Sequence, residues 1–148
     1  MDISVIIVSF NTKKITEECL GSLLRSLRQT ELKWEVIVVD NASTDGSKDM
    51  LKKKFPKVKT ILNRENLGFG KANNIGMKAA TGEFILLLNS DTLIVNNAIG
   101  KLVAFGRQHQ NAFIGPKLLN PDRTPQTSCG PFFSLPVIFA ALFLQGVS

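Results

Sequence analysis

The sequence predicts an α/β fold, a three-layer sandwich in which helices cover both faces of a mostly parallel sheet. Two segments, Ile3–Ser9 and Trp34–Asp40, are continuous runs of β-branched and other apolar residues, which is typical of strands buried on both faces. The segments between successive predicted strands are long enough for a helix, and strand–helix–strand units of this kind place their strands in parallel. With 148 residues, of which 44% are hydrophobic and 20% charged, the chain has the size and composition of a globular domain.

A helix is expected after the first strand, because apolar side chains recur there at helical spacing and Asn11 or Thr12 can cap its start. The stripe consists of Ile15, Cys19, Leu20, Leu23, Leu24 and Leu27. After the second strand, residues 41–47 predict a turn, and a short lysine-rich helix runs to about Phe55.

The second half of the chain continues the alternation. Residues 58–62 predict a third, shorter strand, followed by a polar, glycine-punctuated loop at residues 63–70 and a helix at residues 71–80. Residues 83–88 predict a fourth strand that ends at Asn89-Ser90-Asp91. Beyond it we expect a helix at residues 94–108, a short strand at 113–115 and an irregular stretch at 116–131.

The formal net charge of +6 favours an anionic partner, which can be a nucleic acid, the phosphates of a nucleotide or an acidic membrane surface. The densest basic run is Lys52-Lys53-Lys54, followed by Lys57 and Lys59. This run is typical of a solvated helix end and loop, and the alternative is a contact with anionic lipid headgroups. Stacking aromatic residues do not alternate with these lysines, so a nucleic-acid partner is not expected.

The cysteine and histidine residues predict no metal site. Cys19 and Cys129 lie far apart without metal-ligand spacing, and Cys19 is expected to be a buried thiol in a reducing cytoplasm. His109 lies in a polar stretch and is expected at the surface. Residues 132–144 are strongly apolar, but the run is too short to span a bilayer and Pro136 interrupts it, so we expect it to pack against another surface.

The polar residues of the sequence cluster at the ends of the predicted strands. In open parallel sheets, ligands bind beyond the carboxyl ends of the strands, so the functional site is predicted there. The segments concerned are Ser9-Phe10-Asn11, Asp40-Asn41, the loop at residues 63–70 and Asn89-Ser90-Asp91.

Two carboxylates follow apolar strands directly. Asp40 can accept a hydrogen bond from a ribose hydroxyl or a pyrimidine imide N–H, or it can cap the next turn. Asp91 offers hard oxygen ligands that suit Mg²⁺ or Mn²⁺, which usually take further ligands from substrate phosphates. The alternative for Asp91 is to cap the helix that follows.

Two glycines, Gly68 and Gly70, come just before the third predicted helix. Backbone N–H groups at the start of that helix can approach an anion, with Lys71 adding positive charge, or the glycines can serve a turn that needs positive φ. The turn after the first strand, Ser9-Phe10-Asn11-Thr12, holds no glycine, and the chain has no Walker A sequence. Both absences argue against a dinucleotide dehydrogenase or a P-loop enzyme.

Four motifs together resemble those of the family 2 glycosyltransferases, and the resemblance covers nearly the whole chain. They are Ile6-Ile7-Val8-Ser9-Phe10-Asn11, Val38-Val39-Asp40-Asn41-Ala42-Ser43-Thr44-Asp45-Gly46-Ser47, Asn66-Leu67-Gly68-Phe69-Gly70-Lys71-Ala72-Asn73-Asn74-Ile75-Gly76 and Leu87-Leu88-Asn89-Ser90-Asp91. The last two motifs and residues 116–122 are similar to the rhamnosyltransferase-like branch. The resemblance implies a truncated GT-A fold, in which residues 1–131 form the nucleotide-sugar-binding domain and residues 132–148 begin a missing acceptor-side half.

The resemblance also implies a donor site that holds a nucleoside diphosphate sugar through Mg²⁺ or Mn²⁺. In that site Asp40 would contact the base or ribose, and Asp91 would be the last acid of the DxD motif and the metal ligand. The other residues expected to line the nucleotide are Ser9, Phe10, Asn11, Asn41, Asn66, Gly68, Gly70, Lys71, Asn73, Asn89 and Ser90, with Asn74 a further candidate.

The sequence departs from the family pattern at two points. The first position of the DxD motif is Asn89, whose amide supplies no charge to a metal. No residue after Asp122 is acidic, so the catalytic base of the family is expected downstream and none of the present residues is predicted to be catalytic. We therefore expect a truncated chain that binds nucleotide without transferring sugar efficiently.

The resemblance implies inverting transfer from dTDP-rhamnose or a UDP-sugar to a cell-surface glycan or lipid-linked acceptor. The implied setting is bacterial polysaccharide assembly at the inner face of the cytoplasmic membrane. The apolar residues 132–144 would then pack against a second copy of the chain. Two alternatives are a non-catalytic nucleotide-binding module and a different nucleotide-dependent α/β enzyme.

Overall fold

The computed structural model describes residues 1–109 and 112–127. The chain divides into two compact units, Met1–Ile114 and Gly115–Ser148. The predicted apolar segment at residues 132–148 and Cys129 lie outside the described residues, so the expectations for them stay predictions. None of the described helices is long and apolar enough to cross a membrane.

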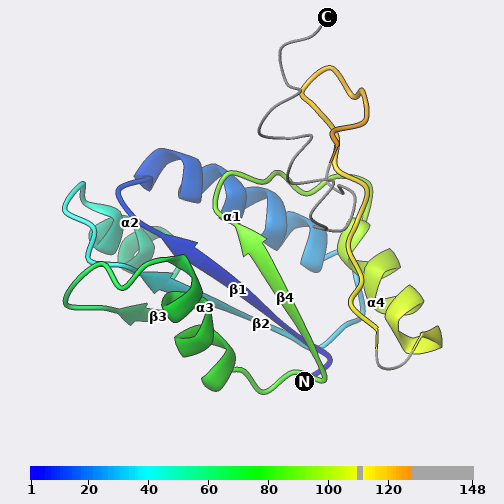
Figure 1. Ribbon diagram of the computed structural model, residues 1–148, viewed down its shortest axis with the longest axis horizontal. Coiled ribbons are helices and arrows are strands. Elements are labelled where there is room, and N and C mark those ends of the chain that lie inside the picture. The colour runs from blue at the N-terminus through cyan, green and yellow to red at the C-terminus, as the bar shows by residue number, and fades with distance from the viewer. Residues whose placement is uncertain (110–111, 128–148) are drawn as a thin grey trace, which may run out of the picture. The chain divides into compact units, whose positions relative to one another are not determined.

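The first unit is built on a four-stranded sheet whose paired strands all run in parallel. The strands are β1 (Ile3–Ser9), β2 (Trp34–Asp40), β3 (Lys59–Leu62) and β4 (Phe84–Asn89), in the spatial order β3-β2-β1-β4. Ser9 lies opposite Asp40, and Val8 lies opposite Asn89. The carboxyl ends of the strands therefore meet at one edge, where the arrowheads point in Figure 1.

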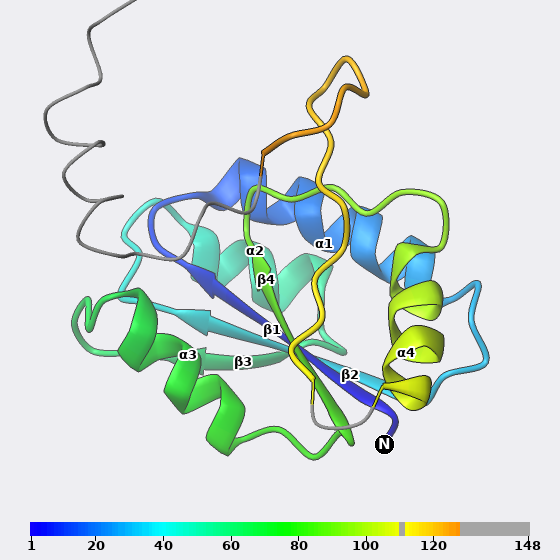
Figure 2. The same ribbon diagram turned by 45° about the vertical axis from the view of Figure 1, so that its right-hand side comes forward.

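Helices cover both faces of the sheet, as predicted for a three-layer α/β/α sandwich. α1 (Lys13–Leu27), α2 (Ser47–Lys54) and α4 (Ala98–Gln108) share the larger apolar core with one face. α3 (Phe69–Lys78) packs on the other face, over β1 and β2. Figure 2 shows the sheet between α1 and α2 on one side and α3 on the other.

β1 and β2 have the predicted bounds, because their side chains have an apolar environment on both faces. Ile3, Val5 and Ile7 point into the core below α1, while Ile37 and Val39 point toward α3. A continuous run of β-branched residues suits such a doubly covered strand.

Three predicted helix details are wrong. α3 begins and ends two residues before the predicted helix at residues 71–80, because Gly68 in a left-handed conformation already starts it. α4 begins at Ala98 rather than Ile94, because Asn96 (φ 53°) and Asn97 (φ 52°) adopt left-handed backbone that a helix cannot contain. Ile15, expected in the apolar stripe of α1, is 46% exposed, whereas the other members of the stripe contact the core.

The predicted strand at residues 113–115 is also wrong. Within residues 112–127 the structure has one antiparallel bridge, between Leu119 and Pro125, and no strand at 113–115. Phe113 is fully exposed, so no contact of its side chain stabilises an extended, paired backbone there. In the second unit, the stretch expected to be irregular contains a tight turn in which Arg123 has φ 67° and Asp122 accepts two hydrogen bonds from Thr124.

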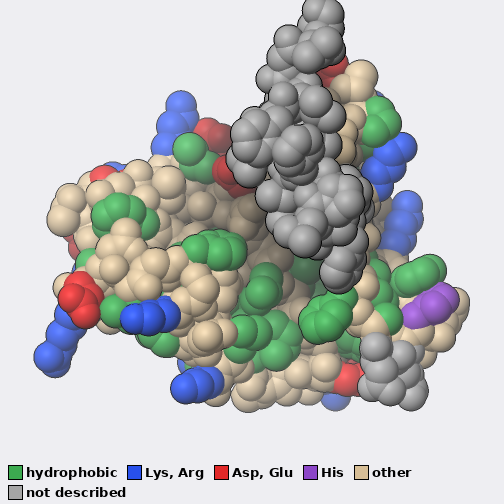
Figure 3. Space-filling model, viewed as in Figure 1, with side chains coloured by type: hydrophobic (Ala, Val, Ile, Leu, Met, Phe, Trp, Pro, Cys, Tyr) green, Lys and Arg blue, Asp and Glu red, His purple; other side chains and the backbone are tan. Residues whose placement is uncertain are grey.

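One part of the α3 side of the sheet is left open in the described residues. Ile85 and Leu87 of β4 are each nearly half exposed, although β4 lies beside the fully buried β1. Leu87 is paired with Ile6, which α3 covers through its close contact with Gly76. In Figure 3 hydrophobic side chains gather on this face, where β4 runs in Figure 1.

Candidate functional site

Asp40 ends β2 and is buried at the carboxyl edge of the sheet, with 3% of its surface exposed. Its Oδ1 accepts a hydrogen bond of 2.8 Å from the backbone N–H of Ser43. Its Oδ2 is buried with no hydrogen-bond partner among the described residues. A buried carboxylate oxygen without a donor is energetically costly, which marks this oxygen as an acceptor for an N–H or O–H from outside the fold.

Asn41, the next residue, links three segments of this edge. Its backbone N–H donates to the carbonyl of Ser9, and its side-chain N–H₂ donates to Oδ1 of Asn66 at 2.7 Å. Its Oδ1 accepts from the side chain of Asn63 and from the backbone N–H of Leu67. Asn41 therefore holds the loop between β3 and α3 against the end of β2, and its amide is committed to the protein itself.

The start of α3 is shaped by the same loop. Oδ1 of Asn66 also accepts from the N–H of Gly68, which adopts φ 79° and ψ 164°, a conformation that is essentially restricted to glycine. Ala72 is the first residue of α3 whose N–H has a backbone partner, the carbonyl of Gly68. In the described structure the N–H groups of Phe69, Gly70 and Lys71 thus have no hydrogen-bond partner, and all three residues are exposed. Such a helix start suits an anion.

The turn between β1 and α1 clamps the loop that follows β2. Asn11 has φ 53°, accepts a hydrogen bond from the N–H of Thr44 and donates its own N–H to the hydroxyl of Ser43. Phe10 is 44% exposed at this turn. Ser9, in contrast, is buried and shares hydrogen bonds with the hydroxyls of Thr12 and Thr16, so its side chain packs beneath α1.

Asp45 connects the starts of two helices. Its Oδ2 accepts the N–H of Lys13 at 2.8 Å, and its Oδ1 accepts the N–H and hydroxyl of Ser47. Partial desolvation raises the pKa of this carboxyl, but the hydrogen bonds from Ser47 and Lys13 outweigh it and hold the pKa below its ordinary value. Asp45 thus fixes the loop after β2 relative to α1.

The end of β4 is more open than the end of β2. Asn89 and Asp91 are exposed, and Ser90 is partly exposed. The carbonyl of Asn89 accepts the N–H of Thr92 and the thiol of Cys19. Burial raises the pKa of the Cys19 thiol to about 11, with the nearby charge of Asp91 acting in the same direction. Cys19 is thus a buried thiol, as predicted.

The donor set at this end fits a divalent cation that is completed by a ligand. The Asp91 carboxylate makes no hydrogen bond or ion pair within the described residues, and these contain no cluster of three or more acidic, cysteine or histidine side chains. Mg²⁺ and Mn²⁺ suit one carboxylate plus water and phosphate oxygens, so a closed protein cage is not required. The carboxylate of Asp91 is the group in this segment that would hold the cation.

The structure brings the predicted segments together at one edge, but their roles stay predictions. Asp40 is buried while Asp91 is exposed, so the two acids lie at the same edge of the sheet but differ in their exposure to solvent. On α3, Asn73 is buried and donates to the carbonyl of Phe69, whereas Asn74 is exposed. His109 is exposed, as predicted, and stacks on Phe105.

Four residues that are central to the loop network were not predicted to have a role. These residues are Ser43, Thr44, Asp45 and Asn63. Their signal is a density of Asn, Asp, Ser and Thr, residues whose side chains readily bond nearby backbone groups. That composition predicts turns, but it does not reveal which distant segment each side chain will contact.

Residues 4–126 match the model of one protein family, described as glycosyl transferase family 2. The chain belongs to this family. The match includes every strand of the sheet and all the segments of its carboxyl edge. The rhamnosyltransferase-like branch stays a prediction.

Three curated relatives carry names of glycosyltransferases for poly(ribitol-phosphate) or for teichuronic acid biosynthesis. The chain is 36% identical over 75% of its length to a poly(ribitol-phosphate) beta-glucosyltransferase of Bacillus spizizenii. It is 31% identical over 83% to a putative teichuronic acid biosynthesis glycosyltransferase, TuaG, of Bacillus subtilis, and 33% identical over 86% to the poly(ribitol-phosphate) beta-N-acetylglucosaminyltransferase TarS of Staphylococcus aureus. The chain spans only 18%, 50% and 23% of these relatives, in that order.

Solved structures show the fold. TarS residues 1–349 from S. aureus, in complex with UDP-GlcNAc, match with a TM-score of 0.59 and 33% identity, covering 74% of this chain and 32% of that one. The mannosyltransferase PcManGT from Pyrobaculum calidifontis, in complex with GDP-Man and Mn²⁺, matches with a TM-score of 0.60 and 26% identity, covering 70% of this chain and 32% of that one. The predicted GT-A fold is confirmed.

Proposed function

We propose that this family 2 glycosyltransferase chain binds the nucleoside diphosphate sugar donor at the carboxyl edge of its sheet. The donor is a UDP-sugar or dTDP-rhamnose. The relatives with bound UDP-GlcNAc and GDP-Man support a nucleotide-sugar ligand, and the relatives named as poly(ribitol-phosphate) glycosyltransferases support a polymeric acceptor.

The observation that carries the proposal is the unpartnered Oδ2 of Asp40. It lies at the end of a central strand, and the hydrogen bond to Ser43 leaves it as the free acceptor of the carboxylate. A pyrimidine imide N–H or a ribose hydroxyl supplies the missing donor. Because Oδ2 is shielded from solvent, the groups that cover it must shift for a ligand to reach it.

The diphosphate is assigned to the space between α3 and the end of β4. The free N–H groups of Phe69, Gly70 and Lys71, together with the Lys71 ammonium, attract phosphate oxygens. Asp91 would hold Mg²⁺ or Mn²⁺, which offsets the negative charge on the departing nucleotide. Asn89 supplies an amide in place of a second carboxylate, so Asp91 would hold the cation together with oxygens of the phosphates and of water.

We assign no catalytic base to this chain. In the proposed reaction the acceptor hydroxyl attacks the anomeric carbon from the face opposite the nucleotide and gives its proton to a base that we do not place among these residues. The bond between that carbon and the nucleoside diphosphate breaks, and the configuration at the carbon inverts. We place this reaction in polysaccharide assembly at the cytoplasmic face of a bacterial membrane, with a glycan or lipid-linked acceptor. We further propose that two copies of the chain associate through residues 132–144.

Calorimetric titration with UDP, dTDP and GDP, each with and without Mn²⁺, tests the donor site. Asp40→Asn preserves the shape of the side chain and is expected to weaken UDP binding roughly 10- to 100-fold under both conditions, because it removes a charged acceptor. Asp91→Asn is expected to abolish only the enhancement by Mn²⁺. Glu31→Gln, an exposed acid at the opposite edge of the sheet, should match the wild type. Unchanged affinities in both site variants would overturn the proposal.

A further inference from the structure

A second candidate site lies in the helical layer, away from the carboxyl edge of the sheet. A groove of about 360 Å³ runs between the C-terminal half of α1 and the segment that follows α2. Both helices start at the carboxyl edge and run toward the amino edge, so their C-terminal ends lie at the far end of the layer. The proposed donor site does not use any residue of this groove.

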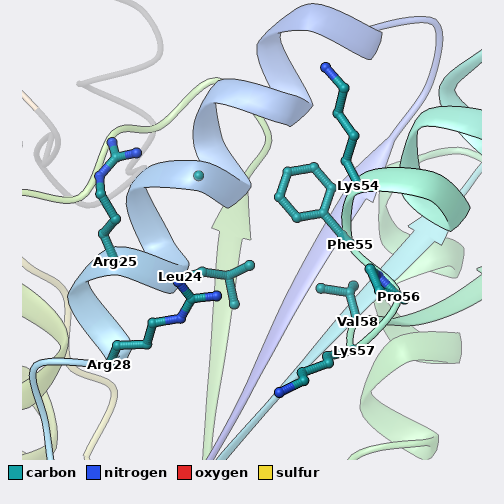
Figure 4. A pocket seen from close by; sticks show the side chains of 9 residues that line it. Leu24, Arg25, Arg28, Lys54, Phe55, Pro56, Lys57 and Val58 are labelled. Carbon is teal, nitrogen blue, oxygen red and sulfur yellow. The ribbon is translucent and has the colours of Figure 1, made fainter.

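The groove has an apolar floor. Leu24 and Phe55 are partly buried against the main core, and Val58 is buried beside them. Gly21 leaves the floor open, because it has no side chain to fill the space. Figure 4 shows Leu24, Phe55 and Val58 grouped together at the centre of the groove.

The rim of the groove carries four cations and no acid. Arg25, Arg28, Lys54 and Lys57 are all exposed. Lys54 is paired with Glu17, but the other three make no ion pair within the described residues. In Figure 4 Arg28 and Lys57 flank the apolar centre, and Lys54 extends away toward the start of α1. Three uncompensated charges around an apolar floor favour an anionic ligand that also has an apolar part.

We infer that this groove is a docking surface for the anionic phospholipids of a membrane. The guanidinium of Arg28 and the ammonium of Lys57 contact the phosphate, and the floor contacts the glycerol and upper acyl region. Lys52 and Lys53 of α2, the residues before Lys54, are also exposed. An inorganic phosphate matches only the charges of the rim, whereas a phospholipid matches both the charges and the apolar floor, which favours the membrane.

Vesicle co-sedimentation of the full chain tests this inference. The wild type is expected to bind vesicles that contain phosphatidylglycerol, to ignore pure phosphatidylcholine, and to lose binding as salt rises. The double variant Arg28→Gln/Lys57→Gln is expected to lose roughly tenfold or more in vesicle affinity. Thermal unfolding confirms that each variant is folded, and both positions are exposed.

The matched control removes the same charge elsewhere. Lys78→Gln/Lys101→Gln changes two exposed lysines of α3 and α4 and should bind vesicles like the wild type. Equal losses in the two double variants, or equal binding to both kinds of vesicle, would overturn the inference. Full competition by millimolar inorganic phosphate at constant ionic strength would overturn it as well, because it would indicate a small-anion site. UDP binding is expected to be unchanged in Arg28→Gln/Lys57→Gln, so this test is independent of the donor site.

Discussion

The ends of β2 and β4 lie at the same edge of the sheet, yet they are built in different ways. At the end of β2, Asp40 and Asn41 are 3% and 2% exposed, and Asn41 is hydrogen-bonded to Ser9 of β1 and to the loop between β3 and α3. At the end of β4, Asn89 and Asp91 are exposed, and the contacts of the segment are mostly backbone contacts.

Because of this difference, substitutions at the β2 end are expected to change the stability of the free protein, and substitutions at the β4 end are expected to change ligand binding. The β2 end is organised by the fold itself, so a substitution there removes bonds that the free protein already makes. The Asp91 carboxylate at the β4 end makes no such bond in the described structure. It therefore contributes binding free energy only when a cation and a ligand are present. The predictions below test that separation, starting with the largest expected effect.

Asn41→Ala is expected to destabilise the protein by about 3 kcal/mol. The change leaves two partly buried donors, the side-chain N–H of Asn63 and the backbone N–H of Leu67, without their acceptor and removes one donor to Asn66, and each unpartnered buried group costs about 1–3 kcal/mol. Urea unfolding followed by circular dichroism measures the loss. Asn74→Ala, at an exposed position of α3, serves as control and should stay within about 0.5 kcal/mol of the wild type. Equal effects of the two changes would show that the network contributes nothing.

Gly68→Ala is expected to cost about 1–3 kcal/mol, because φ 79° with ψ 164° is strained for any residue with a Cβ atom. No atom lies within 4 Å of the added methyl group, so a steric clash does not contribute. Gly70→Ala, also in open space but inside α3, is the matched control and should be neutral or slightly stabilising. Thermal unfolding of both variants measures these changes. A Gly68→Ala variant as stable as the wild type would contradict the assigned backbone conformation.

Asp45→Asn is expected to lower stability by less than about 1 kcal/mol at neutral pH, because Asp45 is exposed and water competes for its hydrogen bonds. The folded-state pKa of Asp45 lies below its ordinary value of 3.8, so the ionised form stabilises the fold. That contribution is fully present well above pH 3.8 and is lost as the pH falls through the lower, folded-state pKa. The gap between wild type and variant, measured by urea unfolding, should therefore close in acid. A gap that widens in acid would contradict the sign of the shift.

Asp91→Asn is expected to change stability by no more than about 0.5 kcal/mol while removing the binding of Mn²⁺. Its carboxylate makes no intramolecular hydrogen bond that the substitution could break within the described residues. Differential scanning calorimetry with and without Mn²⁺ and UDP separates the two effects. A large loss of stability without ligand would mean that the β4 end is as preorganised as the β2 end.

The sheet could be predicted from the sequence where the environment is uniform. β1 and β2 are covered on both faces, so a predominantly apolar run, interrupted by Ser4 in β1 and by Glu35 in β2, was enough to define them. The start of α4 could not be predicted, because the left-handed backbone of Asn96 and Asn97 overrides an apolar periodicity that begins at Ile94. The prediction of a strand around Phe113 was wrong, because a short apolar run does not by itself provide a neighbouring strand to pair with.

For the site, the sequence could predict where it lies but not which side chains are hydrogen-bonded to one another. Strand ends in a parallel sheet meet at one edge whatever the side chains, so Asp40, Asn41 and Asp91 were expected near one another. The bonds of Asn41 to Asn63 and Asn66 depend on how separate loops fold together, and several amides were equally able to make them. Ser9 illustrates the same limit, because its hydroxyl packs beneath α1 rather than along the open edge.

The most direct test of a shared donor site is the backbone amide NMR spectrum of the chain during titration with paramagnetic Mn²⁺, without and then with UDP. We predict that Mn²⁺ first broadens the signals around Asp91, and that UDP extends the broadening to the start of α3 and shifts the signals of residues 40–43. Broadening centred on other acids such as Asp49 or Asp122, with the Asp91 signals sharp and residues 40–43 unmoved by UDP, would contradict it.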